Sequence, residues 1–248
     1  MFDLTGKTAL ITGATGGIGA SIAKALHGAG ATIAISGTRS AVLEELKAAL
    51  GGRVHVLPCN LSDAADVEKL VPAAETAMGG IDILVNNAGI TKDGLAMRMK
   101  DEDWAAVLDV NLTASFRLCR AAMRPMMKKR WGRIVNITSI VGVTGNPGQA
   151  NYVASKAGII GLTRELASQW GRYGIRVNAV APGFFASEMT AELGDDPEAF
   201  PEFLLARTPL HRGGRAGELD EAVLFLLGAG SSFVTGHVLS VDGGMSVR

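Results

Sequence analysis

Short apolar runs alternate with longer amphipathic segments along the whole chain. Each short run has the length of a buried strand, whereas apolar residues in the longer segments recur every three or four positions, as on one face of a helix. The pattern therefore predicts alternating strands and helices. The strands are expected near 7–12, 31–36, 53–58, 81–86, 132–138, 175–181 and 237–241, and the helices near 17–28, 40–50, 63–78, 102–129, 151–172 and 217–228.

This alternation is typical of α/β proteins in which helices cover both faces of a parallel sheet. We predict a doubly wound, Rossmann-type fold with a seven-stranded parallel sheet. With 248 residues, the chain has the length of a single domain, residues 1–248, that buries a large core. The segment 184–216 contains several prolines and Gly213-Gly214, and we expect it to be a substrate-covering insertion.

Composition limits the partners that the protein can have. The 24 basic and 24 acidic residues balance, so no overall field attracts nucleic acid or an anionic membrane. No apolar run approaches a membrane span, and the N-terminus lacks the pattern of a signal peptide. Cys59 and Cys119 are too few for a disulfide framework, and the four histidines lack metal-ligand spacing. We expect a cytoplasmic protein with no metal, no nucleic acid and no membrane as partner.

A glycine-rich turn follows the first expected strand and opens the first expected helix. It reads Gly13-Ala14-Thr15-Gly16-Gly17-Ile18-Gly19. The spacing is neither that of the GxGxxG fingerprint nor that of a Walker loop, but glycines at this point let backbone approach a pyrophosphate at a helix N-terminus. A tight turn that binds nothing is the alternative for such a cluster alone.

Tyr152 and Lys156 lie four residues apart on an expected helix, so their side chains share a face. A nearby ammonium favours the ionised phenol, whose ordinary pKa is about 10. A phenol with a lowered pKa can exchange protons near neutral pH. A packed ring beside a solvated amine has the same spacing, so the pair alone does not identify a catalytic site.

Several motifs together carry a family resemblance. They are Thr12-Gly13 with Gly17-Ile18-Gly19, Asn86-Asn87-Ala88-Gly89, Asn111, Ser139, Tyr152 with Lys156, and Pro182-Gly183. In order and spacing the chain resembles the short-chain dehydrogenase/reductase family over essentially its whole length. Residues 1 to about 160 are most similar to bacterial 3-oxoacyl-acyl-carrier-protein reductases, notably in 86–94 and 142–152. The C-terminal third, in 181–190 and 208–212, is more similar to general ketoreductases of the family.

The resemblance implies a role for each of four catalytic residues. Tyr152 would donate a proton to the substrate carbonyl oxygen, and Ser139 would hydrogen-bond and polarise that oxygen. Lys156 would hold the nicotinamide ribose and lower the phenol pKa, and Asn111 would anchor a water relay behind it. As structural alternatives, Ser139 is an ordinary strand-end hydroxyl and Asn111 a helix residue bonded to backbone.

The end of the second strand predicts the cofactor. NAD-dependent enzymes usually place a carboxylate there for the ribose hydroxyls, but this chain has Thr38-Arg39. A guanidinium and a hydroxyl suit a 2′-phosphate, so we predict NADP(H). Asn60 stands where the family most often has Asp, and its carbonyl is expected to accept from the adenine amino group. The resemblance adds these cofactor-binding residues to the glycine turn: Thr38, Arg39, Asn60, Leu61, Asn87, Ala88, Gly89, Tyr152, Lys156, Pro182, Gly183, Phe185 and Ser187.

The predicted function is NADPH-dependent reduction of a 3-oxoacyl thioester on an acyl carrier protein, as in fatty acid biosynthesis. A general ketoreductase that acts on small ketones or secondary alcohols is the alternative. A catalytically silent nucleotide-binding protein on the same fold is a third. Lys128-Lys129-Arg130, with Arg133 and Arg172, could form a basic patch near the entrance that receives the acidic carrier, or an ordinary solvated helix end.

We also predict a homotetramer, because two helices carry more apolar residues than one face against the sheet can use. The resemblance implies pairing of these helices across one two-fold axis and of the last strand, Val238-Leu239-Ser240-Val241, across another. Thicker packing within one subunit is the alternative. The apolar residues are Val107, Leu108, Leu112, Phe116, Leu118, Met123 and Met126 on one helix, and Ala154, Ala157, Ile160, Leu162, Leu166 and Trp170 on the other.

Overall fold

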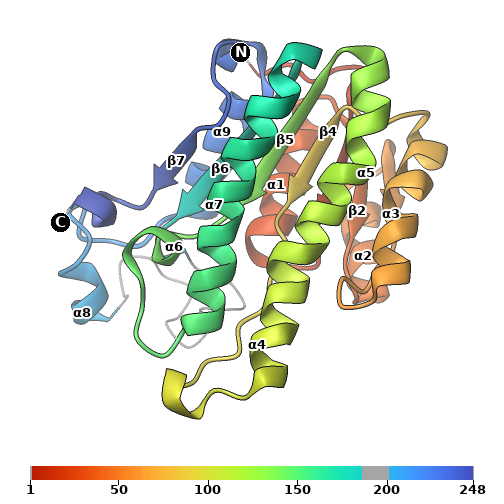
Figure 1. Cartoon of the computed structure of the whole chain (residues 1–248). Coiled ribbons are helices and arrows are strands. Elements are labelled where there is room, and N and C mark those ends of the chain that lie inside the picture. Colours follow the sequence, from red (N-terminus) through yellow and green to blue (C-terminus); the bar gives the residue numbers. More distant parts are fainter. Residues whose placement is uncertain (1, 186–200, 248) are drawn as a thin grey trace.

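The computed structural model describes residues 2–185 and 201–247, in which seven strands form one parallel sheet of order β3-β2-β1-β4-β5-β6-β7. This order confirms the predicted doubly wound fold (Figure 1). Ser187 and the rest of 186–200, the middle of the expected insertion, lie outside the described residues. The strands are β1 (Thr8–Thr12), β2 (Thr32–Ser36), β3 (Val54–Val56), β4 (Ile83–Asn86), β5 (Gly132–Ile137), β6 (Ile175–Pro182) and β7 (Val238–Val241).

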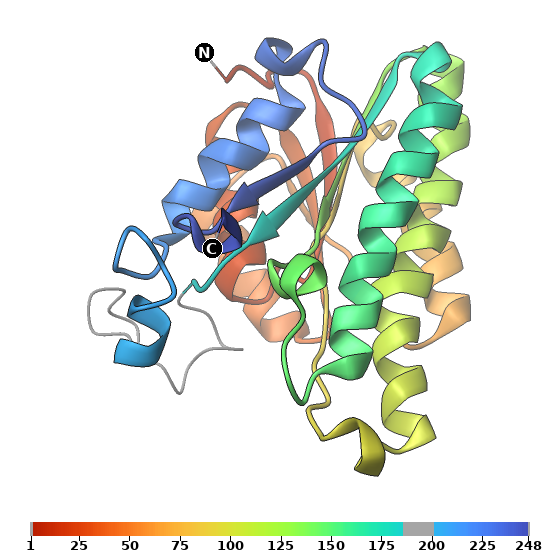
Figure 2. The ribbon, with the colours of Figure 1, turned by 60° about the vertical axis from the view of Figure 1, so that its left-hand side comes forward.

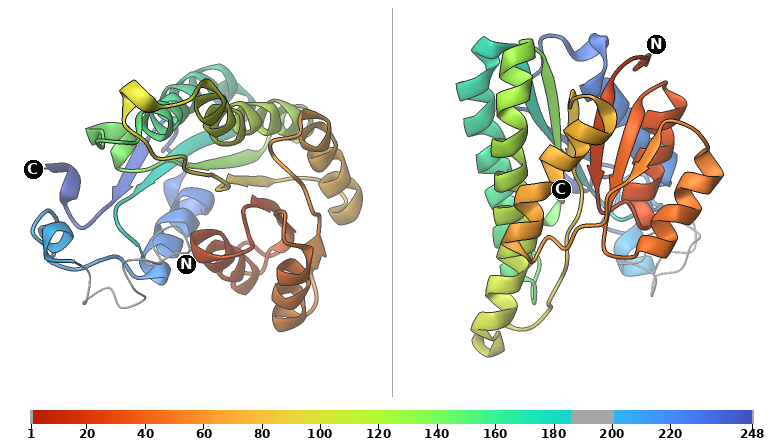
Figure 3. Two further views of the ribbon diagram at one scale, coloured as in Figure 1. Left: turned by 90° about the horizontal axis from the view of Figure 1, so that it is seen from below. Right: turned by 90° about the vertical axis from the view of Figure 1, so that its right-hand side faces the viewer.

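Helices cover both faces of the sheet, which gives three layers (Figures 2 and 3). One face carries α1 (Gly17–Gly28), α2 (Ser40–Leu50) and α9 (Ala216–Leu227), and the other carries α3 (Ala64–Met78), α5 (Ala114–Lys129) and α7 (Ala150–Trp170). Shorter helices lie between these elements. They are α4 (Asp101–Leu108), α6 (Val141–Thr144), α8 (Glu202–Leu205), and the 3₁₀ turns η1 (Ala96–Arg98), η3 (Gly171–Tyr173), η6 (Ala229–Ser231) and η7 (Met245–Val247). Among the described residues, no helix is both long and apolar enough to span a bilayer.

The strands divide their side chains between two cores. In β1, Ala9 and Ile11 pack toward α1 and α9, whereas Leu10 packs toward α3 and α5. Ile33 and Ala34 of β2 divide in the same way. Successive strand residues point to opposite faces, so continuous apolar runs, rather than alternating ones, are what a sheet covered on both sides requires.

The expected helix 102–129 is helical throughout, but it is not one regular α-helix. A π-helical turn, η2 (Asp109–Thr113), separates α4 from α5. Such a turn adds one residue to the helix without breaking it, so the apolar spacing changes too little to reveal it. It carries Asn111, which is 1% exposed.

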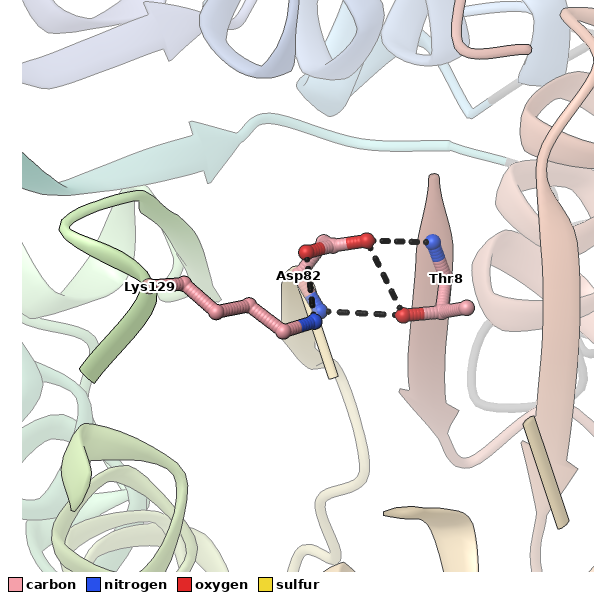
Figure 4. Close-up of polar contacts among 3 residues, drawn as sticks. All are labelled: Thr8, Asp82 and Lys129. Atoms are coloured by element: carbon pink, nitrogen blue, oxygen red, sulfur yellow. Dashed lines mark hydrogen bonds and ion pairs between the residues drawn. The ribbon is translucent and has the colours of Figure 1, made fainter. Parts of the chain in front are cut away.

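The basic patch lies at the end of the molecule away from the cavity, which favours the alternative of an ordinary solvated helix end over a carrier site. Lys129 ends α5 beside the starts of β1 and β4, where its Nζ is 2.9 Å from Asp82 Oδ1 (Figure 4). Asp82 Oδ2 also accepts from the Thr8 backbone N and Oγ1, at 3.0 and 3.1 Å. These contacts hold the amino ends of the strands together, opposite the carboxyl ends at which α/β proteins bind ligands. The patch therefore does not border the substrate entrance of its own subunit.

Part of the apolar surplus serves the subunit's own core. Five of the residues assigned to an interface are at most 6% exposed within one subunit: Val107, Leu118, Met126, Leu166 and Trp170. Phe116 on α5 is 40% exposed, and Trp104 on α4 is 41% exposed. The apolar face that is left for a partner subunit is thus smaller than the sequence suggested.

Candidate active site

A cavity of about 570 Å³ lies at the carboxyl ends of the strands, where the strand order reverses between β1 and β4. It brings together most of the predicted site: Gly13, Thr15, Gly16, Gly17, Ile18, Gly19, Thr38, Arg39, Asn60, Leu61, Asn87, Ala88, Gly89, Ser139, Tyr152, Lys156, Pro182, Gly183 and Phe185. Ala14 and Asn111 do not line it. Ala14 is fully buried and donates its N–H to Ser36 O, so it shapes the glycine turn from behind.

The glycine turn is shaped by close contacts with the end of β4. Thr12 Oγ1 accepts from the backbone N–H groups of Asn87 and Ala88, at 3.1 and 3.2 Å. Gly13 has φ +68°, and a Cβ there would lie 2.8 Å from Asn87 Nδ2. A Cβ at Gly19 would overlap the Gly13 carbonyl oxygen. The turn therefore needs glycine, and it directs the first N–H groups of α1 at the cavity, as a phosphate site requires.

The far end of the cavity is cationic. Arg39 Nη2 donates to Thr15 O at 3.0 Å and to Thr15 Oγ1 at 3.1 Å, which holds the guanidinium beside the glycine turn. Thr38 lines the cavity next to it, and among the described lining residues there is no Asp or Glu. An anionic ligand therefore meets a helix N-terminus and a guanidinium, and none of the described lining residues would repel it with a carboxylate.

The hydrogen bonds of the Asn60 side chain differ from those that the sequence predicted. Its Oδ1 accepts from the Ser62 backbone N at 3.1 Å and from Ser62 Oγ at 2.7 Å. Since the backbone N–H can only donate, the amide orientation is fixed with oxygen toward Ser62. The oxygen expected to accept from adenine is engaged in this turn, and the Nδ2 donor is the group left for a ligand.

Tyr152 and Lys156 lie in the first two turns of α7, as the spacing predicted. They are 9% and 4% exposed, and Lys156 Nζ is 5.6 Å from the centre of the Tyr152 ring. Lys156 Nζ donates to Ile137 O at 2.9 Å, and Thr138 Oγ1 donates to Lys156 O at 2.7 Å. The end of β5 thus fixes both the catalytic helix and the ammonium.

The spacing of Tyr152 and Lys156 predicted a lowered pKa for the phenol, and the structure gives a raised one. Burial raises the pKa of Tyr152 to about 12, against the opposing effect of a hydrogen bond with Ser139, and the Asp93 charge raises it further. Burial lowers the pKa of Lys156 to about 8. Desolvation is therefore the largest cause of both shifts. At neutral pH the phenol is protonated, which is the form that a proton donor needs.

Asn111 lies behind the cavity on the π-helical turn. Its Oδ1 accepts from Ile90 N at 2.8 Å, and its Nδ2 donates to Ile90 O and Ser155 Oγ at 3.0 and 3.1 Å. A Cβ on Gly89 would lie 3.3 Å from Asn111 Oδ1 and 3.4 Å from Lys156 Nζ. The bonding to backbone that was the structural alternative for Asn111 is therefore observed, and its role in a water relay stays a prediction.

Sequence reasoning missed Asn146 and Gln149, which also line the cavity. Gln149 is the N-cap residue of α7 and does not have a helical backbone conformation, so helical spacing from Tyr152 gave no signal for it. No cluster of His, Cys, Asp or Glu within the described residues could hold a metal ion.

Comparisons with known proteins agree with this geometry. The family model described as enoyl-(acyl carrier protein) reductase matches residues 13–246. The chain belongs to the short-chain dehydrogenase/reductase family. It is 52% identical to nodulation protein G of Rhizobium sp. (strain N33) over 100% of both chains, and 50% identical to a 3-oxoacyl-[acyl-carrier-protein] reductase of Rickettsia bellii over 99% of both.

Solved structures of this family have the same fold. The gluconate 5-dehydrogenase from Burkholderia cenocepacia, in complex with NADP and tartrate, superposes with a TM-score of 0.92 at 37% identity, covering 100% of this chain and 98% of that one. The family recognised from the motifs is confirmed. As a member of this short-chain dehydrogenase/reductase family, the protein is an oxidoreductase.

Proposed function

We propose that the protein reduces a 3-oxoacyl thioester, held on an acyl carrier protein, to the 3-hydroxyacyl thioester with NADPH. The observation that carries the proposal is the buried, protonated Tyr152 phenol, beside Ser139 and Lys156 in a cavity without described carboxylates. Full-length identity of 50% with a 3-oxoacyl-[acyl-carrier-protein] reductase supports this substrate class.

The cavity fits NADP(H) in size and charge. Its volume of about 570 Å³ lies within the range of small-molecule and cofactor sites. The α1 N-terminus would bind the pyrophosphate, and Thr38 and Arg39 would bind the 2′-phosphate. NADP in the Burkholderia cenocepacia relative supports the same cofactor here. When bound, the reduced nicotinamide supplies a hydride to the substrate carbonyl carbon.

The chain's own groups would handle the oxygen and the proton. Ser139 Oγ would donate a hydrogen bond to the carbonyl oxygen, and Tyr152 would transfer its proton to that oxygen as negative charge develops. The Lys156 ammonium would then stabilise the phenolate. With a pKa of about 8, it can also return a proton to the phenol near neutral pH.

Replacing Tyr152 with Phe tests the proposal. Tyr152→Phe should lower kcat for an acetoacetyl thioester by about 10²–10⁴-fold, as is typical for the loss of a general acid. The NADPH dissociation constant, measured by fluorescence titration, should stay within about threefold because the ring remains. A loss of NADPH affinity as large as the loss of rate would contradict the role of proton donor.

A general ketoreductase is the second candidate. The close structural match to a gluconate 5-dehydrogenase with bound tartrate favours it, as does the similarity of the C-terminal third to ketoreductases. Steady-state rates with acetoacetyl thioesters, simple ketones and small hydroxy acids separate the two candidates. Turnover of ketones or hydroxy acids, without turnover of thioesters, would select the second.

The homotetramer also remains a proposal. The exposed Trp104 and Phe116 side chains on α4 and α5 support an interface on this face, since large aromatic side chains are enriched in interface cores. Light scattering should give about four times the 25.7 kDa of one chain. A mass of one chain would refute the assembly.

A further inference from the structure

Gln149 lies at the start of the catalytic helix, on the cavity wall. It is the N-cap residue of α7, three residues before Tyr152, and both side chains line the same cavity. A substrate whose reacting carbonyl binds Tyr152 therefore extends through a cavity that Gln149 also lines.

Two neighbours fix the orientation of the Gln149 amide. Its Nε2 donates to Asp93 Oδ2 at 2.8 Å, and its Oε1 accepts from Asn146 Nδ2 at 2.9 Å. A carboxylate only accepts, so the nitrogen must face Asp93. The Gly94 N–H also donates to Gly148 O at 2.7 Å, which ties the segment after β4 to the start of α7. The amide is thus held before any substrate arrives.

Gln149 Nε2 carries two hydrogens, and it donates one of them to Asp93. The other has no acceptor among the described residues. A 3-oxoacyl thioester has two carbonyl oxygens, separated by a single methylene group. Tyr152 and Ser139 would bind the reacting one. The second oxygen loses its water when it enters the cavity, and a buried carbonyl needs a donor in exchange.

We infer that Gln149 donates its second N–H to the thioester carbonyl oxygen and so selects 3-oxoacyl thioesters over simple ketones. Asp93 and Asn146 act as positioning residues that hold the amide. The inference rests on the proposed function, since it names how that substrate class is recognised. A purely structural Gln149, which only joins two loops, would affect all substrates alike.

A matched pair of substrates separates these roles. One is an S-acetoacetyl thioester, and the other is the corresponding 3-oxobutyl thioether, in which CH2 replaces the thioester carbonyl. Gln149→Met keeps the length of the side chain and removes the N–H. It should lower kcat/KM for the thioester by about 10- to 100-fold and that for the thioether by less than about threefold. If the thioether turns over too slowly, its inhibition constant against the thioester serves instead.

The control is Gln169→Met on the last turn of α7, where the amide bonds to Glu165 in solvent. It should leave both substrates unaffected. A binding measurement complements the kinetics. Calorimetry in the presence of NADP+, which has no hydride to transfer, should give about tenfold weaker binding of the acetoacetyl thioester to Gln149→Met, with the affinity for NADP+ itself unchanged.

The outcomes distinguish the inference from the function on which it rests. Selective loss with the thioester supports the inference. Equal loss with both substrates, or no loss with either, overturns the inference. The proposed function stands in that case as long as the wild type reduces the thioester. A wild type that reduces the thioether and simple ketones, but not the thioester, overturns the proposed function and the inference with it.

Discussion

Replacing Lys156 with Met should abolish turnover and at the same time stabilise the fold. Lys156 is 4% exposed, and burial lowers the pKa of its ammonium from 10.5 to about 8. A lowered pKa means that the folded state resists protonation of this group. Above pH 10.5 Lys156 is neutral in the folded and the unfolded state, and it costs no stability. The cost grows as the pH falls from 10.5 toward 8 and is complete below pH 8.

The size of the effect follows from the pKa. Each pKa unit corresponds to about 1.4 kcal/mol, so a change from 10.5 to about 8 costs the folded state about 3 kcal/mol at pH 7. Met fills a similar volume without charge, but it loses the 2.9 Å bond from Nζ to Ile137 O, which offsets about 1 kcal/mol. The net gain of about 2 kcal/mol raises Tm by about 4–8 °C in a chain of this length.

Thermal unfolding of Lys156→Met and wild type at pH 7 and pH 10 measures this gain. The difference in Tm should be largest at pH 7 and should nearly vanish at pH 10, where the wild-type side chain is neutral as well. Lys129→Met is the control, since it leaves the Asp82 carboxylate without its cation and should lower Tm. An unchanged or lower Tm for Lys156→Met at pH 7 would refute the reasoning that the buried ammonium costs stability.

Three further substitutions test other parts of the structure. Arg39→Ala should weaken NADPH binding about ten- to hundredfold without changing NADH binding, and equal losses in a titration with both cofactors would exclude a phosphate contact. Asn60→Asp should tighten NADPH binding about two- to tenfold, because one carboxylate oxygen can accept from Ser62 while the other accepts from adenine; weaker binding would argue against the base lying there. Burial raises the pKa of Asp220, which accepts from Ser21 Oγ at 2.6 Å, so its ionised form costs stability once the pH rises through the folded-state pKa. Asp220→Asn should raise Tm at pH 8 and by less as the pH falls, and a gain that does not depend on pH would show that charge is not its cause.

The sheet and the position of the cavity were predictable from local signals. Buried strands in a doubly covered sheet are continuous apolar runs, and residues that directly follow such runs meet at one edge. Gly13, Asn87 and Ser139 are examples, since each follows a strand and lines the cavity. The same rule would have placed Lys129 correctly, because residues that directly precede a strand lie at the opposite edge.

Other features depend on the whole fold. The pKa of Tyr152 is set chiefly by its burial under several elements, whereas the sequence shows only its spacing from Lys156. The engagement of Asn60 Oδ1 by Ser62 depends on a turn conformation, and the spacing of Asn111 from its neighbours gives no sign of a π-helical turn.

The π-helical turn Asp109–Thr113 makes the length of this part of the chain important, beyond the identity of its residues. It holds one residue more than an α-helix would need over the same distance. Loss of a single codon here would restore a regular helix, in which α4 and α5 keep their faces and Val107 keeps its place in the core. The widened turn that presents Asn111 would be lost, and with it the hydrogen bonds of Asn111 to Ile90 and Ser155. Insertions and deletions among natural variants should therefore be tolerated in the surface loops and excluded from these five positions.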